Sequence, residues 1–384
     1  MTPRLLYISE DYFTSDVHHK LLNELGKSGH YDPTVFYSER ESYGDLGKVD
    51  QYKDLRYSRA KYDIPHSLEK KYKYNFFYKI GYKSRALCDI ADCSKFDIIH
   101  AATLFSEGAV AYKLHKRYGT PYTVAVRGTD INLYLKYMVH LWPLARKVLS
   151  NASQVIWTNK QAERYVLSHP ICAFGLKGKI KSKSILIHNG IDDFWIQNAN
   201  FAPREKEARN FLYIGNFSKN KNVTTLMTAF ENIAKIYPDV HLTLVGGGGE
   251  DEQIIIDKCN SNPDLYTYRG KIFDKSILRD IILANDAFVM VSHSETFGLV
   301  YVEALSQNRP VIYTRNQGFD GIINAKVGLS ADSKDLNDIV NSILTLINEF
   351  STFRSIQEQL PQFSWANVAK KYQEIFDSIL NSKL

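Results

Sequence analysis

The stretch from Asp286 to Thr314 reads DAFVMVSHSETFGLVYVEALSQNRPVIYT. Its apolar run from Ala287 to Val291 is rich in β-branched and aromatic residues, which predicts a buried parallel strand. The residues from Leu299 to Leu305 predict a helix, and Pro310 opens a second buried strand from Val311 to Thr314. The polar loop between the first strand and the helix therefore lies at the carboxyl end of a strand, where open α/β sheets bind ligands.

Two glutamates lie at unusual places in this unit. Glu295 is in the loop, and Glu303 lies inside the helix among apolar residues. An unpaired carboxylate in apolar surroundings is unfavourable, so ligand hydroxyls would be suitable donors for Glu303. The start of the helix is also a suitable place for a phosphate, bound by the backbone N–H groups of Thr296, Phe297, Gly298 and Leu299. The structural alternative is a capped helix with one acid on its rim.

The spacing of these acids resembles a known signature. Glu295-x7-Glu303, with T-F-G-L-V after the first glutamate, is similar to the E-x7-E motif of retaining glycosyltransferases with the GT-B fold. This is glycosyltransferase family 4, or group 1, which includes bacterial enzymes of surface-polysaccharide synthesis. The resemblance implies an α/β chain with two doubly wound, Rossmann-like domains that face each other across a cleft. It also implies a hexosyltransferase, with Glu295 binding hydroxyls of the transferred sugar.

Further motifs extend the resemblance through the second half of the chain. The sequence GNFSKNKN after the predicted strand Phe211 to Ile214 is similar to G-R-x4-K-G, whose two cations hold the donor diphosphate in relatives. Lys221 aligns with the lysine, whereas Asn216 stands in place of the arginine. The resemblance implies that Glu303 binds the donor ribose, and that Lys221 and the loop amides bind the diphosphate. Donor-binding residues that the same resemblance implies nearby are Gly215, Asn216, Gly246 of a four-glycine turn, and Ile272 at the nucleobase.

The first half of the chain carries a matching motif with a substitution. The run Arg127-Gly-Thr-Asp130 resembles the H-G-[ST]-D motif of relatives, with arginine in place of histidine. An arginine cannot act as a base, but its fork can hold a phosphate or carboxylate. We expect Asp130 to pair with Arg127 or to cap a helix from Ile131. With Glu295, these two residues are the candidates for catalysis. The glycine loop that relatives carry after the first strand is replaced by EDYFTSD, without glycine.

Composition limits the class of protein. The chain has 384 residues, of which 44% are hydrophobic, so it can form two cores. Residues 1–190 carry 29 Lys and Arg against 18 Asp and Glu, which favours an anionic partner. No run approaches the roughly 20 apolar residues of a membrane span, and no signal peptide is evident. The four scattered cysteines, two of them at Cys88 and Cys93 without further zinc ligands nearby, predict a reduced, cytoplasmic protein.

The segment 52–85 is basic and aromatic. Ten Lys and Arg against three acids lie between Lys53 and Arg85, and seven tyrosines are interleaved from Tyr52 on. Such a composition suits an anionic membrane surface, which would make the protein peripheral on the inner face of the plasma membrane. The alternative is an insertion whose helices pack Tyr and Phe inward and leave Lys outside. We expect no nucleic-acid partner, because no matching motif is present.

The sequence therefore predicts a first, acceptor-side domain over residues 1–192 that contains the insertion 52–85. A linker over 193–208 and a nucleotide-sugar-binding domain over 209–364 follow. Residues 365–384 resemble the closing helix of the family, which crosses back onto the first domain.

The expected activity is retaining transfer from a UDP-sugar, with a GDP-sugar as the alternative, to a glycan or lipid-linked acceptor in surface-polysaccharide synthesis. The resemblance implies that no metal or other cofactor is needed. Two rival functions stay open. One is a catalytically weak partner subunit with the same fold, and the other is a nucleotide-sugar epimerase or a phosphorylase. The sugar, the linkage and the oligomeric state are not specified by the sequence.

Overall fold

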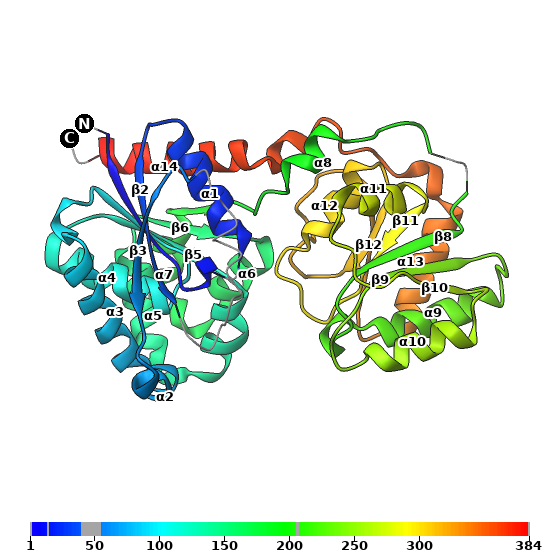
Figure 1. Ribbon diagram of the computed structural model, residues 1–384, viewed down its shortest axis with the longest axis horizontal. Helices are drawn as coiled ribbons and strands as arrows, with labels where there is room; N and C mark the ends of the chain where they lie inside the picture. Colours follow the sequence, from blue (N-terminus) through cyan, green and yellow to red (C-terminus); the bar gives the residue numbers. More distant parts are fainter. Residues whose placement is uncertain (1, 14, 40–54, 205–206, 383–384) are drawn as a thin grey trace. The chain divides into compact units, whose positions relative to one another are not determined.

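A computed structural model describes residues 2–13, 15–39, 55–204 and 207–382. The chain divides into two compact units, the first formed by residues 1–190 with 365–384 and the second by residues 191–364 (Figure 1). Each unit is an α/β layer structure around one parallel sheet. Residues 193–208, which the sequence predicts as a linker, contain the short helix α8 (Asp193–Gln197) and belong to the second unit.

In the described residues, the sheet of the first unit has seven strands in the order β3-β2-β1-β4-β5-β6-β7, and every pair of neighbours is parallel. Its strands are β1 (Arg4–Ile8), β2 (Asp32–Glu39), β3 (Ser58–Asp63), β4 (Ile98–Ala101), β5 (Tyr122–Val126), β6 (Gln154–Trp157) and β7 (Ser184–Leu186). Its helices are α1 (Asp16–Lys27), α2 (His66–Tyr74), α3 (Phe76–Ile90), α4 (Ser106–Tyr118), α5 (Trp142–Asn151), α6 (Lys160–Ser168), α7 (Leu176–Lys181) and α14 (Trp365–Asn381).

The two faces of this sheet are covered by different helices. Alternate residues of β1, Leu6 and Ile8, face a core that also contains Leu87 of α3 and Val110 of α4. The residues between them, Leu5 and Tyr7, face a second core shared with α1 and α14. A strand buried on both faces is continuously apolar, which is why the sequence pattern predicts it well. The C-terminal helix α14 thus packs on the first unit, beside α1.

The second unit has a six-stranded parallel sheet in the order β10-β9-β8-β11-β12-β13. Its strands are β8 (Asn210–Gly215), β9 (His241–Gly246), β10 (Tyr266–Tyr268), β11 (Ala287–Val289), β12 (Val311–Thr314) and β13 (Gly328–Ala331). Its helices besides α8 are α9 (Val223–Ala234), α10 (Glu252–Ser261), α11 (Lys275–Leu283), α12 (Leu299–Ser306) and α13 (Leu336–Asn348). The order confirms a doubly wound sheet, since β11 pairs with β8 rather than with β10.

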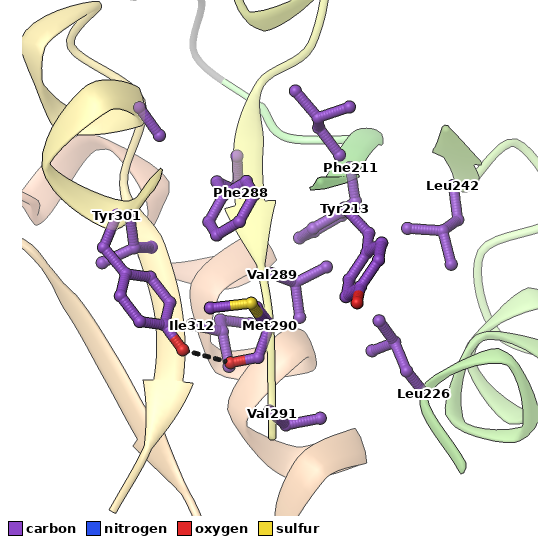
Figure 2. Packing of buried hydrophobic residues seen from close by; sticks show 14 of the residues in the cluster. Phe211, Tyr213, Leu226, Leu242, Phe288, Val289, Met290, Val291, Tyr301 and Ile312 are labelled. Carbon is purple, nitrogen blue, oxygen red and sulfur yellow. Dashed lines mark hydrogen bonds between the residues drawn. The ribbon is translucent and has the colours of Figure 1, made fainter. Parts of the chain in front are cut away.

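The core below the predicted loop fixes the position of α12. Phe288 and Val289 of β11 pack with residues of β8 such as Tyr213 (Figure 2). The hydroxyl of Tyr301 donates a 2.6 Å hydrogen bond to the carbonyl oxygen of Met290, just beyond the end of β11. The strand β11 ends at Val289, two residues before the predicted end at Val291. The N–H of Met290 still donates to Ile312.

The basic, aromatic segment is divided between the core and the surface. Tyr52 and Lys53 lie outside the described residues. Tyr57, Tyr62 and Tyr72 are buried, which agrees with the alternative of inward-packed rings. Tyr74 and Phe77, by contrast, are 78% and 63% exposed.

Candidate functional site

A lysine and a glutamate from adjacent strand ends form the centre of the site in the second unit. Lys221 follows β8 and Glu295 follows β11, and these two strands are hydrogen-bonded neighbours. The ammonium of Lys221 lies 2.6 Å from Oε2 of Glu295. Both side chains are mostly buried, at 20% and 14% exposed. The two residues that the sequence assigned to the diphosphate and to the transferred sugar therefore lie together at the carboxyl edge of the sheet.

Two asparagines join these loops. The side-chain amide of Asn220 donates to the carbonyl oxygen of Ser294 at 2.9 Å, and the backbone carbonyl of Asn220 accepts from the N–H of His293 at 2.8 Å. The side-chain amide of Asn222 donates to the carbonyls of Val291 and Ser333. Neither asparagine can be predicted from a motif, because a hydrogen bond between loops about 70 residues apart leaves no local sequence pattern.

The loop before α12 is held in a conformation that requires glycine. Gly298 has φ of 75°, and a β-carbon on it would lie 2.4 Å from the ring of Tyr301. The N–H of Gly318 donates to the carbonyl of Glu295 at 3.0 Å, and the N–H of Glu295 donates to Oε1 of Gln317 at 3.2 Å. The residues 317–318, which the sequence analysis missed, therefore fix the backbone of Glu295.

The start of α12 has the form expected of an anion site. Gly298 is the N-cap and has no side chain to cap the first turn, which begins at Leu299. Uncapped N–H groups and the helix dipole attract negative charge. Thr296 is exposed and Phe297 is buried, with its ring 6.3 Å from that of Phe363. Thr296 can thus face a ligand, whereas the side chain of Phe297 is part of the core.

Glu303 lies in the second turn of α12 and is half-buried, while its neighbours Val302 and Ala304 are completely buried. Its carboxylate is therefore on the one side of α12 that is not covered by the core. The carbonyl oxygen of Glu303 accepts a bond from Ser306. This placement agrees with a hydroxyl-binding role.

The four-glycine turn lies against the loop after β8. Gly215 and Gly246 are partners in the register of β8 and β9, and a β-carbon on Gly246 would lie 1.7 Å from the carbonyl oxygen of Gly215. Asn216 is exposed, and its side-chain oxygen accepts from the N–H and hydroxyl of Ser218. Asn216 thus closes its own turn and supplies no charge. Ile272, after β10, is half-buried and packs on the core.

Arg127 and Asp130 lie in the first unit. Nε of Arg127 donates to the carbonyl of Ala102 at 2.9 Å. The carboxylate of Asp130 is buried and accepts from the backbone N–H groups of Arg127, Leu104 and Phe105 at 2.9 to 3.2 Å. Burial raises the pKa of Asp130 to about 7 despite these donors. Asp130 accordingly joins two loops at the edge of the sheet. The sequence predicted an ion pair with the side chain of Arg127 or a cap on the following helix, and neither is its main interaction.

A buried charged cluster stands where relatives carry the glycine loop. Glu10 lies two residues after the end of β1, and its carboxylate is 2.5 Å from the ammonium of Lys79 and 3.3 Å from that of Lys83. It also accepts a hydrogen bond from the hydroxyl of Tyr72. Lys83 lies 3.4 Å from Glu107 as well. Burial alone would raise the pKa of Glu10, but the two ammonium groups outweigh it and hold this pKa well below the usual range. The sequence shows the missing glycines but not this replacement, because Lys79 and Lys83 lie on α3, about 70 residues after Glu10 in the chain.

Among the described residues, no group of three or more His, Cys, Asp or Glu side chains could hold a metal ion. Within the same ranges, no helix is both long and apolar enough to cross a bilayer. Two thiols that the sequence analysis considered scattered are neighbours, since Sγ of Cys88 lies 3.5 Å from Sγ of Cys93.

Comparison with known proteins agrees with this geometry. A family model described as "Glycosyl transferases group 1" matches residues 196–360. Residues 196–360 are therefore similar to the group 1 glycosyltransferases. An uncharacterized glycosyltransferase of Methanocaldococcus jannaschii is 27% identical over 310 residues, which are 78% of this chain and 80% of that protein. The glycogen synthase of Mycobacterium tuberculosis is 26% identical over 199 residues, and the match covers 50% of this chain and 47% of that enzyme.

Solved structures confirm the predicted GT-B fold. Sucrose-phosphate synthase from Thermosynechococcus elongatus superposes with a TM-score of 0.70 at 20% identity, over 99% of this chain and all of that one. The lipopolysaccharide outer core galactosyltransferase WaaB gives a TM-score of 0.69 at 15% identity, over 98% and 99% of the two chains. Together with the match to the group 1 model, the named relatives support a glycosyltransferase enzyme of the hexosyltransferase type, as the sequence predicts.

Proposed function

We propose that this chain is a retaining hexosyltransferase of glycosyltransferase family 4. It takes its sugar from a nucleotide-sugar donor, with uridine diphosphate favoured over guanosine diphosphate. The observation that supports this best is the Lys221–Glu295 pair beside the uncapped start of α12. One cation, one carboxylate and a set of backbone N–H groups then meet at a single sheet edge.

In this proposal, the first-turn amides of α12 and the ammonium of Lys221 bind the diphosphate. As the bond to the sugar breaks, negative charge develops on the departing phosphate, and these preorganised donors stabilise it. Glu303 accepts hydrogen bonds from the ribose hydroxyls. Glu295 orients Lys221 and binds hydroxyls of the transferred sugar.

The acceptor we propose is a glycan or lipid-linked glycan in surface-polysaccharide synthesis, consistent with the basic first half of the chain. Arg127 would hold an anionic group of a substrate at the edge of the first sheet. Asp130 would act through the backbone that it positions, rather than by contact with the reacting atoms. The residues assigned to donor and acceptor need no metal for these roles.

A catalytically weak partner subunit is the second candidate. It is favoured by one observation: Asn216 bonds to Ser218 and provides no charge where relatives have an arginine. Such a subunit would bind the donor without turning it over.

The test is a thermal-shift panel of UDP-, GDP-, ADP- and dTDP-sugars, with and without magnesium. A ligand that binds only the native state raises its melting temperature by mass action. One metal-independent stabilising donor, followed by release of its nucleoside diphosphate with a glycan acceptor, is the expected result. Donor binding without turnover would favour the partner subunit, and no shift with any donor would contradict both functions.

A further inference from the structure

Five exposed apolar side chains gather in two segments of the first unit. They are Tyr74, Phe77, Leu133, Tyr137 and Val139, with exposed fractions from 42% to 78%. The first two lie at the junction of α2 and α3. The other three lie on the π-helix η5 (Asp130–Leu135), directly after it, and on the short 3-10 helix η6 (Val139–Leu141). We call this set the aromatic face, and we propose that it docks onto an anionic lipid bilayer.

The two segments meet through a chain of rings. The ring of Phe76 lies 5.8 Å from that of its neighbour Phe77 and 5.8 Å from that of Tyr134. Tyr134 in turn stacks on Phe105 with centroids 4.8 Å apart, so it anchors η5 to the core. Leu133 and Tyr137 flank this anchored ring on the solvent side, as Phe77 flanks Phe76. Side chains from residues about 60 positions apart in the sequence therefore belong to adjoining surfaces.

Basic residues outnumber acidic ones along the two segments that carry the aromatic face, although Glu69 and Asp89 border the first segment and the buried Asp130 begins the second. Residues 70–88 contain six Lys and Arg and no Asp or Glu, and residues 131–162 contain four and none. Lys79 and Lys83 are occupied by the buried cluster, but Lys70, Lys71 and Lys136 are exposed. Each basic residue near an anionic membrane surface strengthens binding. The excess of basic residues therefore favours an anionic partner over a neutral or cationic one.

The side-chain chemistry favours a lipid interface in particular. The ammonium of Lys71 lies 4.3 Å from the ring centre of Tyr78, and that of Lys136 lies 5.1 Å from the ring of Tyr137. A ring with an apolar body and a polar tip, beside a long cationic side chain, suits the headgroup region of a bilayer. Exposed apolar groups rimmed by polar ones mark interaction surfaces more often than a random scatter does.

This inference rests on the proposed function in one respect, namely that a lipid-linked acceptor is presented at a membrane. The π-helix η5 begins at Asp130, three residues after Arg127 at the end of β5. Docking through the aromatic face would therefore hold the carboxyl edge of the first sheet close to the headgroups, where such an acceptor lies.

The experiment is co-sedimentation of the full chain with phosphatidylcholine vesicles, with and without phosphatidylglycerol. We expect binding only to the anionic vesicles, and we expect added salt to weaken it. The double substitutions Tyr74→Ser/Phe77→Ser and Tyr137→Ser/Val139→Ser should each lower the vesicle affinity by about tenfold or more, since each removes two apolar side chains from the interface. A matched control is Ile236→Ser/Ile254→Ser, which changes two exposed residues of the second unit and should bind as the wild type does.

The inference is overturned if the wild type does not bind anionic vesicles, or if both aromatic-face variants bind as well as the control. Melting temperatures within a few degrees of wild type show that a variant is folded. A variant that is not folded is replaced by Lys70→Gln/Lys71→Gln, which should also weaken binding. Donor-induced stabilisation is measured on the same samples without lipid. If the donor still stabilises the protein while vesicle binding is absent, the docking surface is wrong and the transferase function stands. If the protein binds vesicles but no donor, the proposed function is wrong and the docking surface stands.

Discussion

The ammonium of Lys221 lies 2.6 Å from the carboxylate of Glu295, although 74 residues separate the two in the chain. Because both side chains are largely buried, each charge is compensated by the other when no substrate is bound. A diphosphate that enters this site would compete with Glu295 for the same ammonium. If the proposed function holds, the pair links donor binding to the position of the Glu295 carboxylate.

Replacing Lys221 by Met should lower turnover by about a hundredfold or more, because one preorganised donor to the leaving phosphate is lost. The measurement is steady-state release of nucleoside diphosphate with the donor found in the panel. Lys258→Met is the matched control, since Lys258 pairs with Glu231 on other helices of the same unit. Equal turnover in both variants would contradict the assignment of Lys221.

Replacing Glu303 by Ala should raise the donor dissociation constant by about tenfold or more, as expected for lost hydrogen bonds to a charged group. Isothermal titration with the nucleoside diphosphate measures this directly. Glu303→Gln keeps the side-chain shape and should have a smaller effect. An unchanged affinity in the alanine variant would show that Glu303 does not contact the donor.

Removal of Glu10 should destabilise the protein strongly. Glu10→Ala leaves Lys83, which is 1% exposed, with Glu107 as its remaining carboxylate partner. Breaking a buried ion pair on one side costs about 3–5 kcal/mol of the free energy of unfolding. Urea unfolding measures the loss, and Glu24→Ala, at the pair with Lys27 whose lysine is 65% exposed, should change stability by less than about 1 kcal/mol.

The same cluster sets a pH window. The pKa of Glu10 is lowered, so its contribution is complete above its ordinary pKa of 4.5 and is lost as the pH falls through the folded value. Burial would lower the pKa of Lys83, but Glu10 and Glu107 raise it above its ordinary value of 10.5. Its contribution is therefore complete below 10.5 and is lost as the pH rises further. If Glu10→Ala cost the same stability at acidic and neutral pH, this account of the cluster would be wrong.

Asp130 should act on stability with the opposite pH dependence. Its folded pKa of about 7 is above the ordinary 3.8, so the native state binds this proton more tightly than the unfolded state does. The free energy of unfolding should then increase as the pH falls from about 7 towards 4, by at most about 4 kcal/mol. Asp130→Asn should remove that increase, because Asn does not titrate, while its single oxygen still accepts part of these backbone N–H bonds. The difference between wild type and variant isolates the effect from other groups, such as His100, whose pKa is lowered by burial to about 3.

Mild oxidation should join Cys88 and Cys93. Their sulfurs are 3.5 Å apart and need to approach to about 2.05 Å to bond. Cys88 lines a groove of about 580 Å³ between α3 and α4, which gives a reagent access. Diamide takes up the two thiol hydrogens as the S–S bond forms, so peptide mapping should show a mass loss of two hydrogens. Cys172 and Cys259 are buried and separate, and they serve as internal controls. A reagent that left all four as thiols would contradict the prediction.

The sequence determined much of the second unit by itself. The motif from Asp286 to Thr314 specified a strand, a loop and a helix in the correct places, because each depends on local hydrophobic pattern and backbone propensity. The spacing of Glu295 and Glu303 placed one acid before α12 and the other in its second turn. These are properties of a short stretch of chain, which helix geometry fixes without help from the rest of the molecule.

Tertiary structure decided the contacts between distant segments. Lys221 reaches Glu295 because β8 lies next to β11 in the sheet, although β9 and β10 come between them in the chain. Likewise, Glu10 meets Lys83 only because α3 packs over β1, and Asp130 is buried only because the loops after β4 and β5 lie side by side. The composition of the basic, aromatic segment does not show which of its rings are buried. Only the tertiary packing buries Tyr72 and leaves Phe77 exposed. Composition and spacing carry no information on which strand lies beside which, and the free energy of burying and pairing these groups depends on that order.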